Sequence, residues 1–125
     1  MKHITSSETK PEQGSGGPGH TLRHLIAPWT VGSESLWVGE TVIQPGVETR
    51  PSAIEDTESA HVTIEGEGIE IVEGESTETS AGSFVFIPRG AVHQVINRGE
   101  RPLKLITIST PPVSRPASAG GATHA

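Results

Sequence analysis

Short stretches in which apolar and polar residues alternate recur along the middle of the chain. Alternation with a period of two is typical of strands that bury one face, and Pro-Gly, Gly-Glu and Arg-Gly pairs between the stretches favour turns. The expected strands are residues 35–43, 61–64, 68–72, 83–87, 92–96 and 103–109. Short strands at regular spacing predict an all-β sandwich or barrel.

The two ends of the chain lack this pattern. Residues 11–19 (PEQGSGGPG) are rich in Gly and Pro, so we expect residues 1–20 to form a flexible arm and linker. Residues 111–125 contain several prolines and few apolar side chains, which predicts a flexible tail. One folded domain is expected over residues 21–110, because 125 residues are too few for two independent cores.

The apolar residues at the start of this domain need a place where they can be buried. They are candidates for a further strand, which could lie across a dimer interface. These residues are Leu22, Leu25, Ile26 and Trp29.

Composition and charge narrow the possible partners and chemistry. The formal net charge is −6 and the basic residues are scattered, which argues against nucleic acid. No apolar run approaches the roughly 20 residues that cross a bilayer, and residues 1–10 are too polar for a secretory signal, so we expect a cytoplasmic protein without membrane contact. The chain has no Cys. Chemistry must therefore come from His, carboxylates, hydroxyls or a bound ion.

Residues 82–97 (GSFVFIPRGAVHQVIN) combine a turn into a strand, a sharp Pro-Arg-Gly turn and a histidine that begins the next strand facing inward. This stretch resembles the second conserved motif of the cupin superfamily at each defined position. The resemblance implies a cupin double-stranded β-helix, a jelly-roll barrel whose interior can hold a ligand. The matching positions are Gly82, Pro88, Gly90, His93 and Asn97.

The upstream region resembles the first cupin motif only in its layout. In the family that motif supplies two histidines and a glutamate, which hold a divalent ion together with the second-motif histidine. Counting from Gly46 places Ser52 and Ile54 at the two histidine positions, and either Glu58 or Ser59 at the glutamate position, according to the register. Since fewer than three ligands remain, we expect the inherited metal site to be lost and no cofactor to be bound.

His61 could replace part of the lost site, because it lies two residues after Ser59 and so shares its face of the strand. An inward His61 would look across the barrel at His93. Without a metal, the two imidazoles could act as general base and general acid, with Glu58 orienting one of them. With a carboxylate, they could instead bind iron, zinc or manganese. The candidate carboxylates are Glu48, Glu55 and Glu58.

Several other side chains are candidates for contacts with a small organic ligand. Phe84 and Phe86 share one face of a strand and either line the pocket or pack between the sheets. Trp37 has two possible roles, core packing and ligand stacking. The candidate substrate-binding residues are Trp37, Ser59, Thr63, Phe84 and Phe86.

The remaining charged and histidine residues are interpreted as structural or silent. Glu55, Asp56 and Glu58 form an acidic cluster typical of a solvated loop, and Arg89 lies in a turn at the expected barrel mouth. His24 could reach a partner subunit. The histidines expected in flexible segments are His3, His20 and His124.

These observations predict a cupin homodimer that binds a small organic molecule in its barrel. The leading hypothesis is an enzyme in which His61 and His93 transfer protons during isomerisation, elimination or cyclisation; polyketide cyclisation is implied by the resemblance alone. One alternative is a metal-dependent oxygenase or cyclase that uses His61, His93 and a carboxylate. The other is a cupin that binds a metabolite without converting it.

Overall fold

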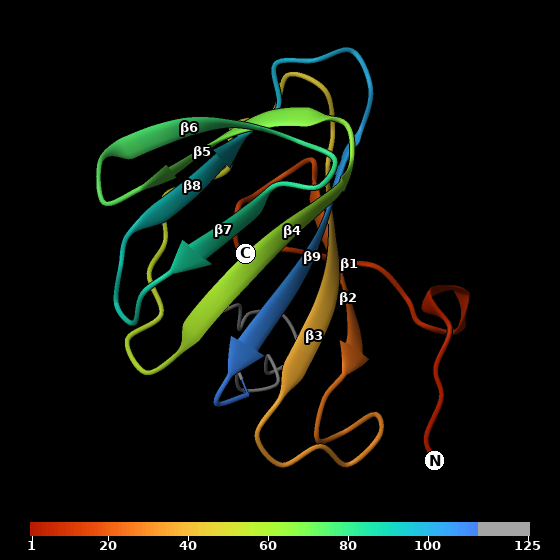
Figure 1. Cartoon of the computed structure of the whole chain (residues 1–125). Helices are drawn as coiled ribbons and strands as arrows, with labels where there is room; N and C mark the ends of the chain where they lie inside the picture. Colours follow the sequence, from red (N-terminus) through yellow and green to blue (C-terminus); the bar gives the residue numbers. More distant parts are fainter. Residues whose placement is uncertain (113–125) are drawn as a thin grey trace.

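The computed structural model describes residues 1–112; the expected tail lies outside them except at Pro111 and Pro112. A short 3-10 turn, Ser6–Glu8, is followed by nine strands in the described part of the chain (Figure 1). No helix in that part is long and apolar enough to cross a membrane. The strands are β1 Glu12–Gln13, β2 His20–Ile26, β3 Trp37–Ile43, β4 Glu58–Glu65, β5 Glu67–Val72, β6 Glu75–Ser80, β7 Phe84–Ile87, β8 His93–Ile96 and β9 Leu103–Thr110.

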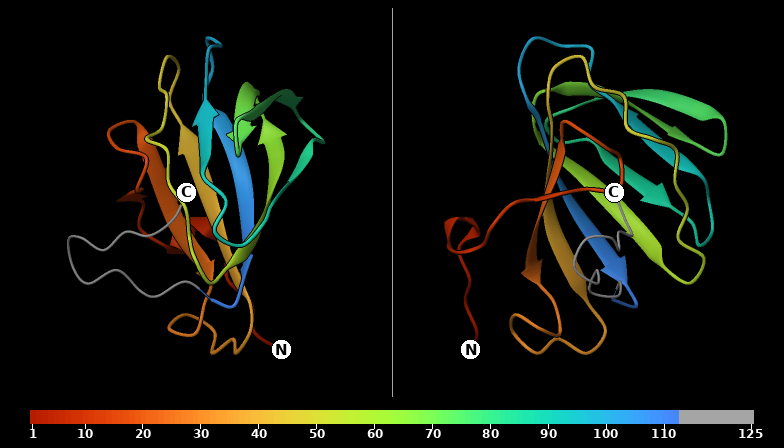
Figure 2. Two further views of the ribbon diagram at one scale, coloured as in Figure 1. Left: turned by 90° about the vertical axis from the view of Figure 1, so that its left-hand side faces the viewer. Right: turned by 180° about the vertical axis from the view of Figure 1, so that it is seen from behind.

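The strands form two antiparallel sheets that face each other (Figures 1 and 2). The larger sheet has the order β1-β2-β3-β9-β4-β7, and the smaller sheet has the order β6-β5-β8. Two facing sheets with these crossovers make a jelly-roll barrel, which confirms the all-β prediction.

The alternation of apolar and polar residues located six of the nine strands. A seventh, β2, contains Leu22, Leu25 and Ile26, three of the four apolar residues for which a further strand was considered, and it pairs with β3 of the same chain. The pattern missed the two-residue β1, which lies within the expected flexible arm. It also missed β6, whose sequence ESTETS has no apolar residue and whose only buried side chain is Thr79. As an edge strand, β6 pairs with β5 alone, so it needs no apolar face.

The segment expected to be a flexible linker, residues 11–19, closes one side of the barrel instead. It contacts a second segment, residues 47–52, which runs beside β8, with Thr49 N–H donating to Val95 O at 2.9 Å. Arg50 N–H donates to Gly16 O, and Gly14 N–H donates to His20 O at the start of β2. Residues 14–17 thereby connect the smaller sheet to the larger one, and the expectation of a mobile tether is wrong for this stretch.

The glycines of this segment are required by close packing. A Cβ atom at Gly16 would lie 2.5 Å from His20 Nδ1 and 2.6 Å from Thr49 Cβ, well inside van der Waals contact. We expect Gly16→Ala to lower the free energy of unfolding by roughly 1–3 kcal/mol, measured by urea denaturation. Gly99→Ala is the matched control, because its nearest atom, Asn97 Oδ1, is 3.4 Å away. Equal stability of both variants would show that residues 14–17 are loosely packed.

The barrel interior is apolar at its two ends and polar in the middle. One cluster of buried residues contains Leu22, Ala27 and Trp37, and the other contains Ile43, Val95, Leu103 and Leu105. Between these ends, the inward positions of β3 and β9 carry Thr41 and Thr107, and β4 adds His61 beside Thr107. The middle of the barrel therefore offers hydrogen-bonding groups away from water.

Candidate functional site

A histidine and a glutamate from opposite sheets meet in this polar middle. The alternation of β4 turns His61 inward, and Glu70 projects inward from β5. His61 Nδ1 lies 2.7 Å from Glu70 Oε1, and the two side chains are only 1% and 2% exposed. Because an ionised carboxylate only accepts hydrogen bonds, Nδ1 carries the proton and Nε2 is left free to face other groups.

His93 begins β8 on the inner face of the smaller sheet. Its ring centroid lies 5.9 Å from that of His61, with the two rings at 74°. Nδ1 donates to Ala91 O at 3.3 Å, so Nε2 holds the lone pair of the neutral ring. Burial and the nearby charge of His61 lower the pKa of His93. His93 is thus a neutral base near pH 7.

His20 adds a third imidazole, although its position in the sequence was interpreted as flexible and silent. The ring is fully buried, and Gly16 N–H donates to its Nδ1 at 2.9 Å, which places the ring proton on Nε2. Within residues 1–112, this Nε2 has no hydrogen-bond partner. Burial, followed by the charges of His61 and His93, lowers the pKa of His20 to about 4. The expectation of a flexible position is therefore wrong, and His20 belongs to the neutral imidazoles of the interior; that it is functionally silent stays a prediction.

The carboxylate predicted at Glu58 is replaced by Glu70. Glu58 is exposed and lies on the opposite face of β4 from His61, because Ser59 occupies the inward position. This register resolves the ambiguity in the sequence, and it separates Glu58 from His61 and His93. The other candidate carboxylates, Glu48 and Glu55, and the neighbouring Asp56 are likewise exposed.

Two of the five predicted ligand contacts, Ser59 and Thr63, lie on the inner face of β4 beside His61. Ser59 Oγ is 2.8 Å from Ser109 Oγ of β9, and Thr63 Oγ1 has no hydrogen-bond partner in the described chain. These hydroxyls could bond a ligand oxygen or nitrogen.

The aromatic residues lie elsewhere. Trp37 is fully buried in an apolar cluster, where its Nε1–H donates to His24 Nδ1 at 3.1 Å. Phe84 and Phe86 are 76% and 59% exposed on β7, because the inward residues of this strand are Val85 and Ile87. Phe86 borders the pocket described below, whereas Trp37 and Phe84 are not among the residues that line that pocket. The expected homodimer remains a prediction.

Arg89 and His24 have structural partners within the chain. Arg89 donates to Asp56 O at 2.7 Å and ties the acidic loop to the Pro-Arg-Gly turn. His24 is buried beside Trp37. His3 is exposed, and His124 lies outside the described residues.

The four positions of the family's metal site no longer form a ligand set. Ser52 pairs with His93 through the backbone, Ile54 packs against the apolar cluster around Trp37, and Ser59 bonds to Ser109. Throughout residues 1–112, no three His, Asp or Glu side chains are grouped so that they could hold a metal ion. The residues present do not fit the divalent ion that the cupin resemblance implies.

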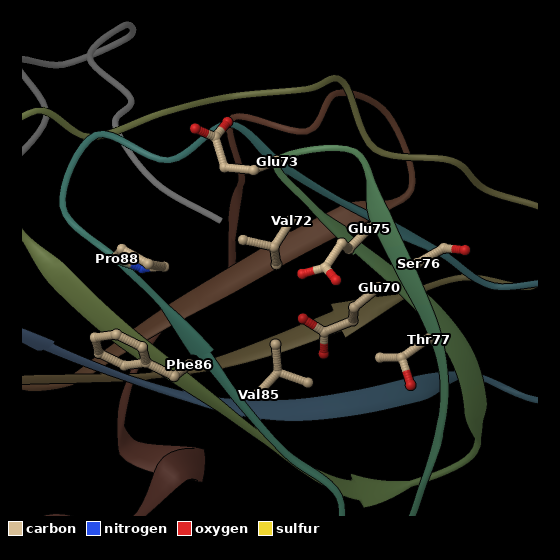
Figure 3. A pocket seen from close by; sticks show the side chains of 9 residues that line it. All are labelled: Glu70, Val72, Glu73, Glu75, Ser76, Thr77, Val85, Phe86 and Pro88. Atoms are coloured by element: carbon tan, nitrogen blue, oxygen red, sulfur yellow. The ribbon is translucent and has the colours of Figure 1, made fainter.

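A pocket of ≈ 380 Å³ lies between the β5–β6 hairpin and β7, the edge strand of the larger sheet (Figure 3). Glu70 lines this pocket, and its carboxylate holds His61. Sequence analysis did not identify the pocket, because the hairpin and β7, although neighbours in the chain, belong to different sheets whose packing the strand pattern does not predict. The lining residues are Glu70, Val72, Glu73, Glu75, Ser76, Thr77, Val85, Phe86 and Pro88.

The chain belongs to the cupin family, since the family model described as a cupin domain matches residues 39–109. A tetracenomycin polyketide synthase protein, TcmJ of Streptomyces glaucescens, is 27% identical over 113 residues, which cover 90% of this chain and 74% of TcmJ. An uncharacterised protein of Methanocaldococcus jannaschii is 27% identical over 114 residues, or 91% of each chain.

Solved structures confirm the cupin jelly-roll. A predicted oxalate decarboxylase from Thermotoga maritima superposes with a TM-score of 0.76 at 21% identity, covering 88% of this chain and 99% of that one. The polyketide cyclase RemF from Streptomyces resistomycificus gives a TM-score of 0.76 at 24% identity, covering 88% and 79%. At these identities the likeness establishes the fold.

Proposed function

We propose that this cupin is an enzyme that transfers protons on a small organic molecule in its barrel, in an isomerisation, elimination or cyclisation. One observation carries the proposal. Two buried histidines on facing sheets, His61 and His93, each keep a free Nε2, but only His61 is paired with a buried carboxylate. Two titratable groups in such different environments are the arrangement that general acid–base catalysis uses.

The environments assign the two roles. His93 is neutral and takes a proton at Nε2 from a C–H or O–H group of the substrate. In the proposed catalytic form His61 carries a second proton, on Nε2, and donates it to a developing oxyanion, while the Glu70 carboxylate 2.7 Å from Nδ1 compensates the charge of the ring. In an isomerisation the proton on His93 returns to a different atom of the product, so no proton is gained or lost.

The relatives support cyclisation among these reactions. Two proteins that share the fold are described as a polyketide synthase protein and a polyketide cyclase. Closing a ring between two carbonyl-bearing segments needs removal of a proton next to one carbonyl and protonation of the other carbonyl oxygen. A base at His93 and an acid at His61 supply these two transfers.

Hydrogen–deuterium exchange tests the proposal before the substrate is known. We would incubate the protein in D₂O with aryl and cyclic ketones whose α-hydrogens exchange slowly, and follow the α-proton signals by NMR. The expected result is exchange that depends on the protein and persists in EDTA. Exchange that EDTA abolishes would favour the metal-dependent alternative. Ketones that bind without exchanging would contradict proton transfer and favour a metabolite-binding protein.

A further inference from the structure

We propose that the pocket between β6 and β7, here called the seam pocket and lined by the nine residues given above, binds a small organic cation. The ligand class is an ammonium group joined to a compact apolar body. Binding of such a cation does not require proton transfer at His61 and His93, so it stands apart from the reaction proposed above.

The inner end of the seam pocket holds a buried carboxylate oxygen without a donor. Glu70 is 2% exposed, and its Oε1 is occupied by His61. Its Oε2 has no hydrogen-bond partner anywhere in residues 1–112. A buried acceptor left in this state costs free energy. An ammonium group in the pocket would supply both the missing donors and a compensating charge.

The rim of the seam pocket adds two more carboxylates. Glu73 and Glu75 flank Gly74 in the β5–β6 turn, and Glu73 and Gly74 both have positive φ, 49° and 82°. This is the two-residue hairpin geometry that glycine and asparagine favour. Glu73 is neither of these residues. Its side chain connects the turn to the start of β8, since its Oε2 accepts a hydrogen bond from Val92 N–H at 3.1 Å.

The charge around the seam pocket is therefore mostly negative. Even with His61 protonated, one positive charge faces the carboxylates of Glu70, Glu73 and Glu75, and the nine lining residues include no Lys or Arg. The net charge of the whole chain, −6, has the same sign. Such a field attracts cations and repels carboxylates and phosphates.

The wall opposite the carboxylates is apolar. Figure 3 shows Glu70 and Glu75 on the hairpin side of the pocket, across from Val85 and Phe86 of β7. Phe86 is more than half exposed, so a cation can reach its ring. A volume of ≈ 380 Å³ matches a ligand of about one ring and a short side chain.

Calorimetric titration with benzylamine and with benzyl alcohol, its neutral near-isostere, tests the proposal. At pH 7 and low salt we expect benzylamine to bind at least tenfold more tightly than benzyl alcohol. Glu70→Gln should weaken benzylamine binding at least tenfold, and a Glu73→Gln/Glu75→Gln double variant should weaken it severalfold. Glu78→Gln is the matched control, because Glu78 is exposed on β6 and does not line the pocket; it should bind as the wild type does.

Equal affinity for the two probes would overturn the proposal. Wild-type affinity for benzylamine in a folded Glu70→Gln protein would do the same. If Glu70→Gln does not fold, the double variant at the exposed rim carries the test, and unchanged binding there overturns the proposal. Amide shifts in NMR spectra should centre on Thr77 and Val85. None of these results depends on the exchange assay, so either proposal can fail alone.

Discussion

Replacing His93 with glutamine is expected to lower kcat/KM by about 10²–10⁴-fold while leaving the melting temperature nearly unchanged. The glutamine amide can occupy the position of the imidazole, but it cannot take up a proton. The assay is exchange or turnover of the most reactive ketone of the panel. Wild-type turnover in a folded His93→Gln protein would exclude His93 as the base.

The pH dependence of the wild-type rate tests the same assignment of His93 as the base. Burial and the charge of His61 lower the pKa of His93, so the base form is already present at pH 7 and is lost only below the ordinary histidine value of 6.5. We expect the wild-type rate to fall on the acid side below that pH. The His93→Gln variant should lose this dependence along with its activity.

His24→Gln is the matched control for His93→Gln. His24 is also a buried histidine, but its Nδ1 accepts from the Trp37 indole within an apolar cluster. Its replacement changes packing without touching His61 or His93. We expect the folded variant to keep the wild-type kcat/KM, and a similar loss in both variants would point to a general structural effect.

The inward positions of the two histidines proposed to transfer protons were predictable, because these residues lie on strands with a regular period. Ser59, His61 and Thr63 alternate with outward residues, so one inward position fixes the other two. His93 follows a Pro-Arg-Gly turn whose spacing resembles a cupin motif. Local geometry therefore placed both residues on inner faces, and the structure brings their rings to 5.9 Å.

Glu70 was not predictable from the same pattern, because the alternation around it is misleading. In the sequence Gly-Ile-Glu-Ile-Val, the isoleucines would be expected inside and the glutamate outside. The structure has Glu70 buried and Ile69 and Ile71 half-buried. Burying a carboxylate is costly unless it is paired, and its partner His61 comes from the other sheet. Only the tertiary structure reveals that pairing.

The buried position of His20 was hidden by composition. Glycines at 14, 16, 17 and 19 are typical of a linker, but Gly14 and Gly16 are needed here because the His20 ring packs directly against them. Composition does not distinguish a glycine that gives freedom from one that permits close approach. The histidine that follows the glycine-rich run was the available signal.

Lowering the pH from 6.5 to 4 is expected to reduce the free energy of unfolding by roughly 3 kcal/mol through His20 alone. In the unfolded chain the imidazole takes up a proton near pH 6.5, but in the folded protein its pKa is about 4. Between these pH values the unfolded state binds more protons, so stability rises with pH. The stability that comes from keeping His20 neutral is fully present above pH 6.5 and is fully lost below pH 4. His93, whose pKa is also lowered, acts in the same direction.

Urea denaturation at pH 7, 5.5 and 4.5 measures this dependence, and His20→Asn isolates its source. The asparagine oxygen can replace Nδ1 as the acceptor for Gly16 N–H, but the side chain does not titrate. The variant should be less stable at pH 7, because it loses packing, and its stability should fall less steeply with acid. The exposed His3→Asn is the control and should keep the wild-type slope. If His20→Asn also keeps that slope, carboxylates elsewhere cause the acid sensitivity. A flatter slope would show that the fold holds His20 neutral, as the interior requires of an imidazole beside His61 and His93.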